Sequence, residues 1–369
     1  MKKIAILYLG NYYYDSRLIN MATSLSNNNY MVDVFCIQSQ QDSSFSPGLK
    51  NVYILPISLK YNGILKYIEF FFKGRKKLNG KKYYCIIAGD VYSLASACYI
   101  RYKARLIYDC REIYSELAAH VNQPFYQLLI TKYEKYFIKF YSNVLVTAQT
   151  DAALLKNKFA KYKHLKWHLL YNFPKYPEDL EIINLHKTYN IPKNHTIICY
   201  QGVIQKGRGI GALFKVLQKN NQLWACIVGD GEAKCYYKKL ANNYSINNHV
   251  LFIGHIPYIK LLEYTAACDI GWAVIQEKGI SNKFALPNKL FEYGLANIPV
   301  IASKLPNLIE IITKYKLGVL VDSQDIDEQL GAINTLKQIG LLSQYNKIIK
   351  DNFLWDVQDK KFIRIIKDS

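Results

Sequence analysis

Short apolar runs alternate along the chain with longer segments in which apolar residues recur every three or four positions. The runs are too short for buried helices and predict parallel strands, whereas the segments between them predict amphipathic helices. This alternation predicts an α/β fold with parallel sheets, whose ligands bind beyond the carboxyl ends of the strands. The expected strands span residues 3–9, 30–37, 51–57, 84–88, 106–108, 143–147, 196–200, 224–228, 250–254 and 300–302.

The strand–helix pattern starts twice, and a chain of 369 residues is too long for one typical core. We therefore expect two domains. Pro174, Pro177 and the acidic residues that follow them indicate a linker. The expected parts are a first domain at 1–175, a linker at 176–192, a second domain at 193–350 and a C-terminal segment at 351–369.

The eight cysteines include no C-x-x-C pair, and most of them lie inside apolar runs. This pattern predicts buried free thiols in a reducing compartment and argues against disulfides or a zinc site. The apolar run after Met1 is too short for a signal peptide and better fits a first strand. Because no apolar run reaches about 18 residues, we expect no transmembrane span and a cytoplasmic protein.

The net charge of +20 is concentrated in the first half of the chain. Residues 1–176 hold 25 Lys and Arg against 10 Asp and Glu, a net charge of +15, whereas residues 177–369 hold 23 against 18, a net charge of +5. The basic half therefore favours an acidic partner such as an anionic lipid, a phosphorylated acceptor or nucleic acid. Nucleic acid is the least favoured partner, because the basic residues are scattered and no aromatic binding platform is evident.

Residues 59–84 combine an apolar, aromatic helix with a cluster of lysines and arginines. One interpretation is an ordinary helix that faces the core and is followed by a charged loop. The other is a segment that lies on an anionic membrane surface, for which this composition is typical. We favour the membrane surface.

The stretch from Leu286 to Ser303 reads as a loop, a short helix with Pro287 in its first turn, a turn and a buried strand. Glu292 is the single acidic residue on this helix. The unpaired amides of a helix N-terminus attract anions, so a carboxylate one turn further suits a nucleotide, with its phosphate at the helix end and its ribose on the acid. The alternative is a surface helix with a solvated Glu292.

Other polar clusters also follow predicted strands. Residues 201–209 form a glycine-rich loop that contains Lys206 and Arg208, and this composition favours a phosphate. Asp109-Cys110-Arg111-Glu112 is a polar cluster after a strand of the first domain. Asp15 and Arg17 also follow a strand, but we interpret them as a helix cap and a surface charge.

Together these motifs resemble a family 4 retaining glycosyltransferase of the GT-B fold, of the bacterial surface-polysaccharide type. The resemblance implies two Rossmann-like parallel-sheet domains that face a central cleft, and a C-terminal helix that crosses back to the first domain. The motifs that carry it are Gly202 to Gly209, Gly229-Asp230-Gly231, Pro287 to Tyr293, Pro299 to Ser303, Tyr108 to Glu112, Tyr171 to Pro174 and Asn352 to Lys361.

By this resemblance, Glu292 holds the ribose hydroxyls of a nucleoside-diphosphate sugar. Arg208, aided by Lys206, holds the diphosphate as it leaves. The other implied donor-binding residues are Gly202, Gly229, Asp230, Asn288, Lys289 and Leu290. Arg111 stands where relatives often have a histidine and is included among the catalytic candidates.

The chain departs from the family pattern at three positions. Phe284 replaces the first glutamate of the family's pair, and we consider Asn282 or Asn288 as its substitute. Val203 replaces a basic residue of the phosphate loop, and Arg111 replaces the histidine. These departures keep open a catalytically silent partner subunit of the same fold; a nucleotide-sugar epimerase of that fold is a further alternative.

The expected activity is metal-independent transfer of a sugar, with retained configuration, to a hydroxyl of a lipid-linked glycan in capsule, lipopolysaccharide or exopolysaccharide synthesis. The expected partners are the nucleotide-sugar donor, that acceptor and a peripheral anionic membrane surface, which places the protein on the inner face of the cell membrane. We expect no metal, no bound cofactor and no nucleic acid, and the sequence indicates no particular oligomeric state.

Overall fold

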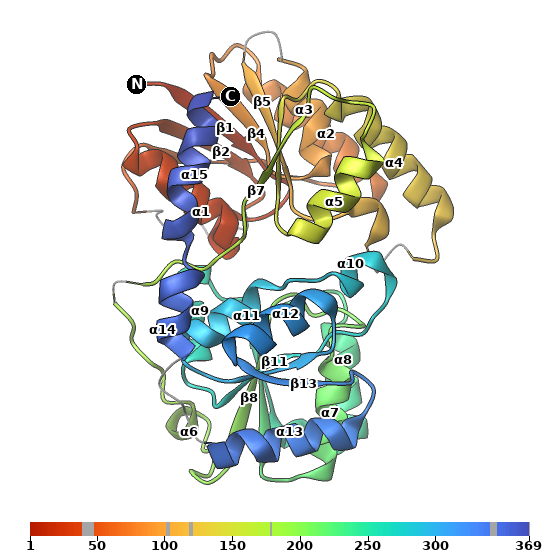
Figure 1. Cartoon of the computed structure of the whole chain (residues 1–369), viewed down its shortest axis with the longest axis vertical. Helices are drawn as coiled ribbons and strands as arrows, with labels where there is room; N and C mark the ends of the chain where they lie inside the picture. The colour runs from red at the N-terminus through yellow and green to blue at the C-terminus, as the bar shows by residue number, and fades with distance from the viewer. Residues whose placement is uncertain (39–47, 101–103, 118–120, 178, 340–344, 369) are drawn as a thin grey trace. The chain divides into compact units, whose positions relative to one another are not determined.

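The computed structural model of the chain describes residues 1–38, 48–100, 104–117, 121–177, 179–339 and 345–368 (Figure 1). The chain divides into two compact units. The first comprises Met1–Asn172 together with Trp355–Ser369, and the second comprises Phe173–Leu354. The whole segment expected as a linker, 176–192, thus belongs to the second unit, and it contains α6 (Leu185–Thr188).

The strands described in the first unit are all parallel and form one seven-stranded sheet in the order β3-β2-β1-β4-β5-β6-β7. Ile4 of β1 pairs with Val32 on one side and Cys85 on the other. The edge strand β7 was not expected, because its sequence is short, mixed in polarity and only partly buried. The strands are β1 (Lys3–Leu7), β2 (Met31–Cys36), β3 (Val52–Pro56), β4 (Cys85–Ala88), β5 (Arg105–Cys110), β6 (Asn143–Val146) and β7 (Lys166–Leu169).

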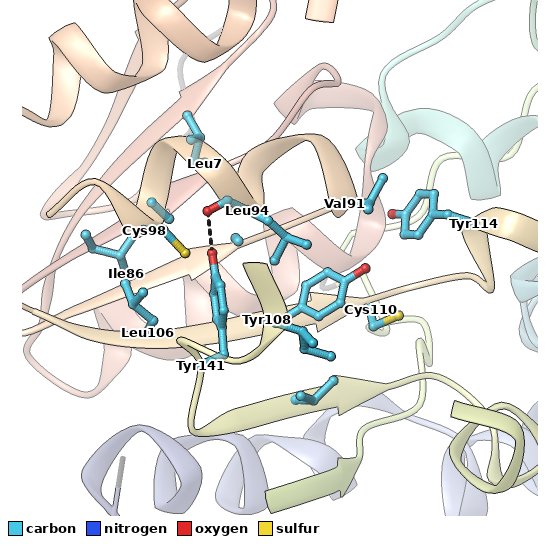
Figure 2. Close-up of a cluster of buried hydrophobic side chains, with 14 of the residues drawn as sticks. Leu7, Ile86, Val91, Leu94, Cys98, Leu106, Tyr108, Cys110, Tyr114 and Tyr141 are labelled. Atoms are coloured by element: carbon cyan, nitrogen blue, oxygen red, sulfur yellow. Dashed lines mark hydrogen bonds between the residues drawn. The ribbon is translucent and has the colours of Figure 1, made fainter. Parts of the chain in front are cut away.

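Helices cover both faces of this sheet (Figure 1). One face carries α2 (Ile64–Leu78), α3 (Leu94–Cys98), α4 (Pro124–Ile138) and α5 (Gln149–Lys158), with the short 3-10 turns η3 (Val91–Ser93) and η4 (Tyr114–Glu116) at strand ends. The turn η1 (Tyr12–Tyr14) belongs to the opposite face, where Tyr12 and Tyr13 are buried. Figure 2 shows the core beneath these helices, where the buried Tyr141 hydroxyl donates to the Leu94 carbonyl at 2.9 Å. Buried tyrosines whose hydroxyl groups form hydrogen bonds contribute to this layer of the core.

The opposite face of the first sheet carries α1 (Ser16–Asn27) and the C-terminal helix α15 (Trp355–Asp368). The Trp355 indole donates to the Ser24 hydroxyl on α1 at 2.8 Å, and Phe362 and Ile366 are buried in the same core. The end of the chain therefore completes the first unit, as the family resemblance implied.

The second unit is also a parallel sheet, of six strands in the order β10-β9-β8-β11-β12-β13. The expected apolar runs become strands within one or two residues of their predicted ends. The apolar pattern did not predict β11 or β13, because Gly271 and Gly318 interrupt it. The strands are β8 (Thr196–Gln201), β9 (Leu223–Val228), β10 (Val250–Gly254), β11 (Ile270–Ala273), β12 (Val300–Ser303) and β13 (Gly318–Val321).

Helices again pack on both faces of the second sheet. One group lies over the core that contains Phe214 and Trp272, namely α7 (Ile210–Lys219), α8 (Lys234–Asn243) and α13 (Ile326–Ile339). Another group contains α11 (Asn288–Leu295), which contacts α9 (Tyr258–Thr265) and α14 (Tyr345–Asn352). The remaining elements are η6 (Asn247–His249), α10 (Gly279–Lys283) and α12 (Pro306–Tyr315).

All eight cysteines are free, and only Cys235 is exposed, so the prediction of buried free thiols is confirmed. In the residues that the structure describes, no helix combines the length and apolarity that a bilayer crossing requires.

Candidate functional site

The glycine-rich loop of the second unit begins at the carboxyl end of β8. Its backbone packs so closely that glycine is required both in the loop and in the turn beside it. Gly229 follows β9 with φ 142°, and a Cβ there would lie 2.0 Å from the Gly202 carbonyl oxygen. Gly209 has φ 83°, and a Cβ there would lie 2.0 Å from the Val274 carbonyl oxygen. Only glycine permits these close backbone approaches, so the backbone of 202–209 is packed directly onto its neighbours.

Side chains and backbone bonds hold the same loop in place. Ile204 is fully buried, and its amide donates to the Asp230 carbonyl at 2.9 Å. The Tyr200 hydroxyl donates to the Val203 carbonyl at 2.7 Å, and the Trp272 indole donates to the Gly209 carbonyl at 3.0 Å. A loop anchored at both ends and in its middle is preorganised to bind a ligand without first being ordered.

Glu292 on α11 is buried, with 7% of its surface exposed, so the alternative of a solvated surface glutamate is wrong. Its carboxylate accepts a hydrogen bond from the side-chain amide of Gln201 at the end of β8. Burial raises the pKa of Glu292 to about 7, although hydrogen bonds from Gln201 and Tyr258 and the charge of Lys289 act to lower the pKa. The carboxylate is held in a polar cluster inside an otherwise apolar helix face.

Lys289 lies one turn before Glu292, and its Nζ is 3.8 Å from the centre of the Tyr200 ring. A Cβ on Gly202 would lie 4.0 Å from Lys289 Cε, so this lysine passes beside the glycine-rich loop. Burial, together with the nearby Arg208 charge, lowers the pKa of Lys289 to about 7, although part of its side chain stays exposed. An arriving anion would favour the protonated form of Lys289.

Pro287 is the N-cap of α11, one residue before the helical turn in which it was predicted. Asn288 and Lys289 occupy the first turn, where helix amides have no intrahelical partner. The Leu290 amide differs, because it donates to the Pro287 carbonyl at 3.1 Å and its side chain is fully buried. The helix end thus presents Asn288 and Lys289, and Leu290 anchors it to the core.

The two basic residues of the loop have different surroundings. Arg208 is half-buried, and its charge acts on both Lys289 and Tyr200, which places it in the cluster with Glu292. Across the described part of the chain, no carboxylate forms an ion pair with Arg208. Lys206 is exposed instead, with Nζ 4.5 Å from the centre of the Tyr236 ring on α8. Arg208 is therefore the better placed of the two for a phosphate.

Asp230 stands beside the loop but is exposed. Its carboxylate accepts from the Gly231 amide at 2.8 Å and pairs with Lys234 at 2.7 Å. The hydrogen bond from Lys234 lowers the pKa of Asp230, so this group is ionised at neutral pH. Gly229 supports the same turn, because its amide donates to the Gly254 carbonyl at 2.8 Å.

The positions of the second unit that depart from the family pattern differ in burial and in their contacts. Phe284 is the half-buried residue that ends α10, and Val203 is exposed. Asn282 is buried, and its amide donates to the Gln276 carbonyl at 3.0 Å, which fixes the loop before α10. Asn288 lies instead in the first turn of α11. Of the two asparagines considered in place of the missing glutamate, Asn288 is therefore the one that stands at the helix N-terminus.

The polar residues at the strand ends of the first unit form a buried ion network. Arg17 is only 1% exposed, and its guanidinium binds both Asp109 oxygens at 2.6–2.9 Å. Arg111 bridges Asp109 at 2.9 Å and Asp15 at 2.6 Å, while Asp15 caps α1 through the Leu18 amide. The prediction of Asp15 as a cap is confirmed. The prediction of Arg17 as a surface charge is wrong, because Asp109 at the end of β5 and the Leu170 carbonyl directly after β7 bind its guanidinium and it is buried.

Arg111 was a catalytic candidate, and its position gives it a structural role, because it joins two carboxylates of the first unit. Its guanidinium carbon lies 4.3 Å from the centre of the Tyr8 ring, and two carboxylates hold it. The charges of Asp15 and Asp109 keep the pKa of Arg111 above its ordinary value despite burial, so it cannot exchange protons as a histidine would. A contact with a substrate remains a prediction for this residue.

The sequence pattern did not indicate Gln201 and Tyr258, which form hydrogen bonds with Glu292, or Thr265, which forms one with Gln201. The one available signal was a glutamine directly before Gly202 at the end of an apolar strand. No metal-binding group of three His, Cys, Asp or Glu side chains occurs among the residues with described positions. The D-x-D sequence Asp325-Ile326-Asp327 is a helix cap, because Asp325 accepts from the Asp327 and Glu328 amides.

Residues 181–353 match the family model described as Glycosyl transferases group 1. A GDP-mannose-dependent alpha-(1-6)-phosphatidylinositol monomannoside mannosyltransferase of Mycobacterium tuberculosis is 24% identical over 164 residues, which are 43% of this chain and 43% of the relative. The similarity thus spans less than half the length of that curated relative.

Solved structures resemble the whole chain. Sucrose-phosphate synthase from Thermosynechococcus elongatus has a TM-score of 0.78 at 16% identity, over 100% of this chain and 99% of its own. Anabaena Alr3699/HepE in complex with UDP-glucose has a TM-score of 0.74 at 16% identity, over 100% of both chains. At these identities the likeness shows the fold, which is the two-unit α/β architecture of GT-B proteins.

Proposed function

We propose, because residues 181–353 match the model for group 1 glycosyl transferases, that this chain transfers a sugar from a nucleoside-diphosphate sugar to an acceptor hydroxyl with retained configuration. The observation that carries the proposal is the cluster of Glu292, Lys289 and Arg208 beside an anchored glycine-rich loop. A buried carboxylate beside two cations and a helix N-terminus complements a nucleotide, whose ribose donates hydrogen bonds and whose diphosphate is anionic.

In this mechanism the Glu292 carboxylate accepts the ribose hydroxyls, and the first turn of α11 faces the phosphates. The bond between the sugar and the diphosphate breaks toward an oxocarbenium-like state, and its electron pair leaves with the diphosphate. Arg208, Lys289 and the α11 dipole stabilise the charge that develops there. We propose that these fixed positive groups perform this stabilisation without a metal ion. The acceptor oxygen attacks from the face that the diphosphate leaves, and its proton passes to the departing diphosphate oxygen.

A thermal-shift panel of UDP, GDP, dTDP, ADP and CMP tests the donor site. We expect one nucleoside diphosphate to raise the melting temperature in a concentration-dependent way, because a ligand that binds only the folded chain stabilises it. The corresponding nucleotide sugar should then be turned over by the purified chain. No stabilisation by any of the five would contradict the proposal.

A catalytically silent partner subunit is the second candidate, because Phe284 and Val203 stand where the family pattern has polar groups. The two candidate functions differ in whether the purified chain alone releases the sugar from the donor. A silent subunit would bind the diphosphate, or nothing, and would release no sugar from the donor in the absence of another protein.

We propose a lipid-linked acceptor at an anionic membrane, because two helices of the first unit expose large apolar side chains. On α2 these are Ile64, which is 70% exposed, Leu65, Ile68 and Phe72; on α4 they are Phe125, which is 73% exposed, Leu128, Leu129 and Tyr136. The opposite side of each helix enters the core through Phe70, Leu78, Ile130 and Ile138. The interpretation of 59–84 as an ordinary core helix thus explains only one face of α2.

Basic residues accompany these apolar side chains. Lys76 and Lys77 are exposed at the end of α2, Lys132 is exposed on α4, and Lys139 is exposed directly after α4. Both helices contact α3, so they lie on the same side of the sheet. Apolar side chains that insert at the headgroup level and lysines that attract anionic lipid are the two components of interfacial binding. The mycobacterial relative is named for phosphatidylinositol monomannoside, a glycolipid, which supports such a substrate class.

Vesicle co-sedimentation tests this surface. We expect binding to vesicles rich in phosphatidylglycerol, weak binding to phosphatidylcholine vesicles, and a loss of about tenfold in affinity for the double variant Phe72→Asp and Phe125→Asp, which removes two apolar anchors and adds two negative charges. Val357→Asp, at an exposed position on α15, is the matched control and should bind like the wild type. Equal binding to neutral and anionic vesicles, or no effect of the double variant, would contradict the proposal.

A further inference from the structure

Gln201 is a fully enclosed polar residue at the carboxyl end of β8, with 1% of its surface exposed. Its side-chain Nε2 donates to Glu292 Oε2 on α11, and its Oε1 lies 2.7 Å from the Thr265 hydroxyl on α9. Its backbone amide donates to the Tyr293 hydroxyl at 3.2 Å. Glu292 on α11 and Thr265 on α9 therefore hold the two ends of this amide, and Tyr258 on α9 is a further hydrogen-bond partner of Glu292.

The Thr265 hydroxyl gives this arrangement a second possible state. It has a single hydrogen, yet two acceptors lie within reach, Gln201 Oε1 at 2.7 Å and the Leu261 carbonyl at 2.9 Å. With Glu292 ionised, Gln201 Nε2 donates to the carboxylate and Thr265 donates to Gln201 Oε1. With Glu292 protonated, the carboxyl O–H donates to Oε1 after the amide turns over, Nε2 donates to Thr265, and Thr265 donates to Leu261. Each polar atom has a partner in both states, so neither leaves a buried group unsatisfied.

We propose that Gln201 is the positioning residue that orients the Glu292 carboxylate for the donor, and that its amide turns over when Glu292 takes up a proton. The inference rests on the proposed function, because the ligand of Glu292 is the donor ribose. An ionised carboxylate accepts two hydroxyl hydrogen bonds, whereas a carboxyl group must use one oxygen as a donor. The state in which Gln201 donates to Glu292 is therefore the state that binds the donor.

The groups that face Glu292 agree with this assignment. Lys289 on its own helix, Tyr258 on α9 and Gln201 on β8 all favour the ionised form, and burial opposes it. Tyr293, whose hydroxyl donates to the Cys199 carbonyl, is the other titratable neighbour, and burial keeps its pKa well above the ordinary value, so it stays neutral. Because burial raises the pKa of Glu292 to about 7, the two states exchange within the physiological range.

The first experiment needs no ligand. In the full chain labelled with ¹³C at glutamate side chains, with the Glu292 signal assigned from Glu292→Gln, we expect a titration midpoint near pH 7. Gln201→Leu should raise this midpoint by about one pH unit, because it removes one hydrogen bond to the charged form. Gln218→Leu, an exposed glutamine on α7, is the control and should leave it unchanged. An unaltered midpoint in Gln201→Leu would overturn the proposal.

The amide itself gives a second readout. The side-chain ¹⁵N signals of Gln201 in the wild type should titrate with the same midpoint as Glu292, because one event moves both. Thr265→Val removes the hydroxyl that anchors the amide but keeps Gln201, and should also shift the Glu292 midpoint, by less than Gln201→Leu. This variant tests the proposal even if Gln201→Leu folds poorly. Gln201 signals that do not change with pH would exclude the turnover.

The pH dependence of the affinity for the nucleoside diphosphate tests whether Gln201 and Glu292 act in donor binding. If only the ionised form binds, a midpoint shift from 7 to 8 reduces the ionised fraction at pH 7 from one half to one eleventh, which weakens binding by about fivefold. The ratio between wild type and Gln201→Leu should approach one by pH 9, with little change in kcat. If the wild type binds no diphosphate, the proposed function fails while the ¹³C result stands; if it binds and the ratio does not depend on pH, the role of Gln201 fails.

Discussion

Arg208→Ala is expected to lower kcat/KM for the nucleotide sugar by about 10²–10³-fold, the effect of removing one preorganised group from a site where charge develops. Arg208 is half-buried in the anchored loop, lies near Lys289 and Tyr200, and forms no ion pair with a carboxylate in the described part of the chain. Its charge is therefore available to a diphosphate. Initial rates with the donor identified by the thermal-shift panel measure the effect, and the same panel should show no stabilisation of the variant.

Lys206→Ala provides the matched control for Arg208→Ala. The two residues lie two positions apart in one loop, but Lys206 is exposed over the Tyr236 ring. We expect its removal to reduce kcat/KM by less than about tenfold, because a solvated cation contributes little beyond long-range attraction. Equal losses in both variants would mean that the loop acts only through its net charge, and an active Arg208→Ala would contradict the assignment of the diphosphate to Arg208.

Asp109→Ala is expected to destabilise the chain by about 3–5 kcal/mol, because it leaves Arg17 enclosed without its carboxylate. Asp109 and Arg17 are both almost fully buried, and Arg111 depends on the same carboxylate. The urea midpoint of unfolding, followed by circular dichroism, measures the loss. An unchanged midpoint would show that solvent reaches Arg17 and that the network is not closed.

The stability that Asp109 provides should not depend on pH near neutrality. Burial acts to raise the pKa of Asp109, but the charges of Arg17 and Arg111 outweigh it and hold the pKa below its ordinary value. The contribution is thus present above the unfolded pKa of about 4 and is lost only as the pH falls through the lower folded value. Asp327→Asn, which breaks the exposed Lys219–Asp327 pair, is the control and should hardly change the midpoint at any of these pH values.

The local pattern of the chain predicted most of its elements. Apolar runs predicted the strands of both sheets, except β7, β11 and β13, where polar residues or a glycine interrupt the run. Glycines and a proline predicted the turn at 202–209 and the start of α11, because backbone geometry at these positions follows from the residue types themselves. The sequence also directed attention to Glu292 and Arg208, which the structure places in one cluster with Lys289.

The chain's own sequence thus determined the α/β class, the two-part organisation and the residue types that suit a nucleotide. Only the tertiary structure decided which side chains meet. Gln201 and Glu292 lie 91 positions apart, and Arg17 and Asp109 lie 92 apart. Their contacts depend on strand order and on the register of neighbouring elements, which periodicity does not specify. Burial follows from the same packing, and burial makes Glu292 a group that titrates near neutral pH and Arg17 a member of an enclosed ion network.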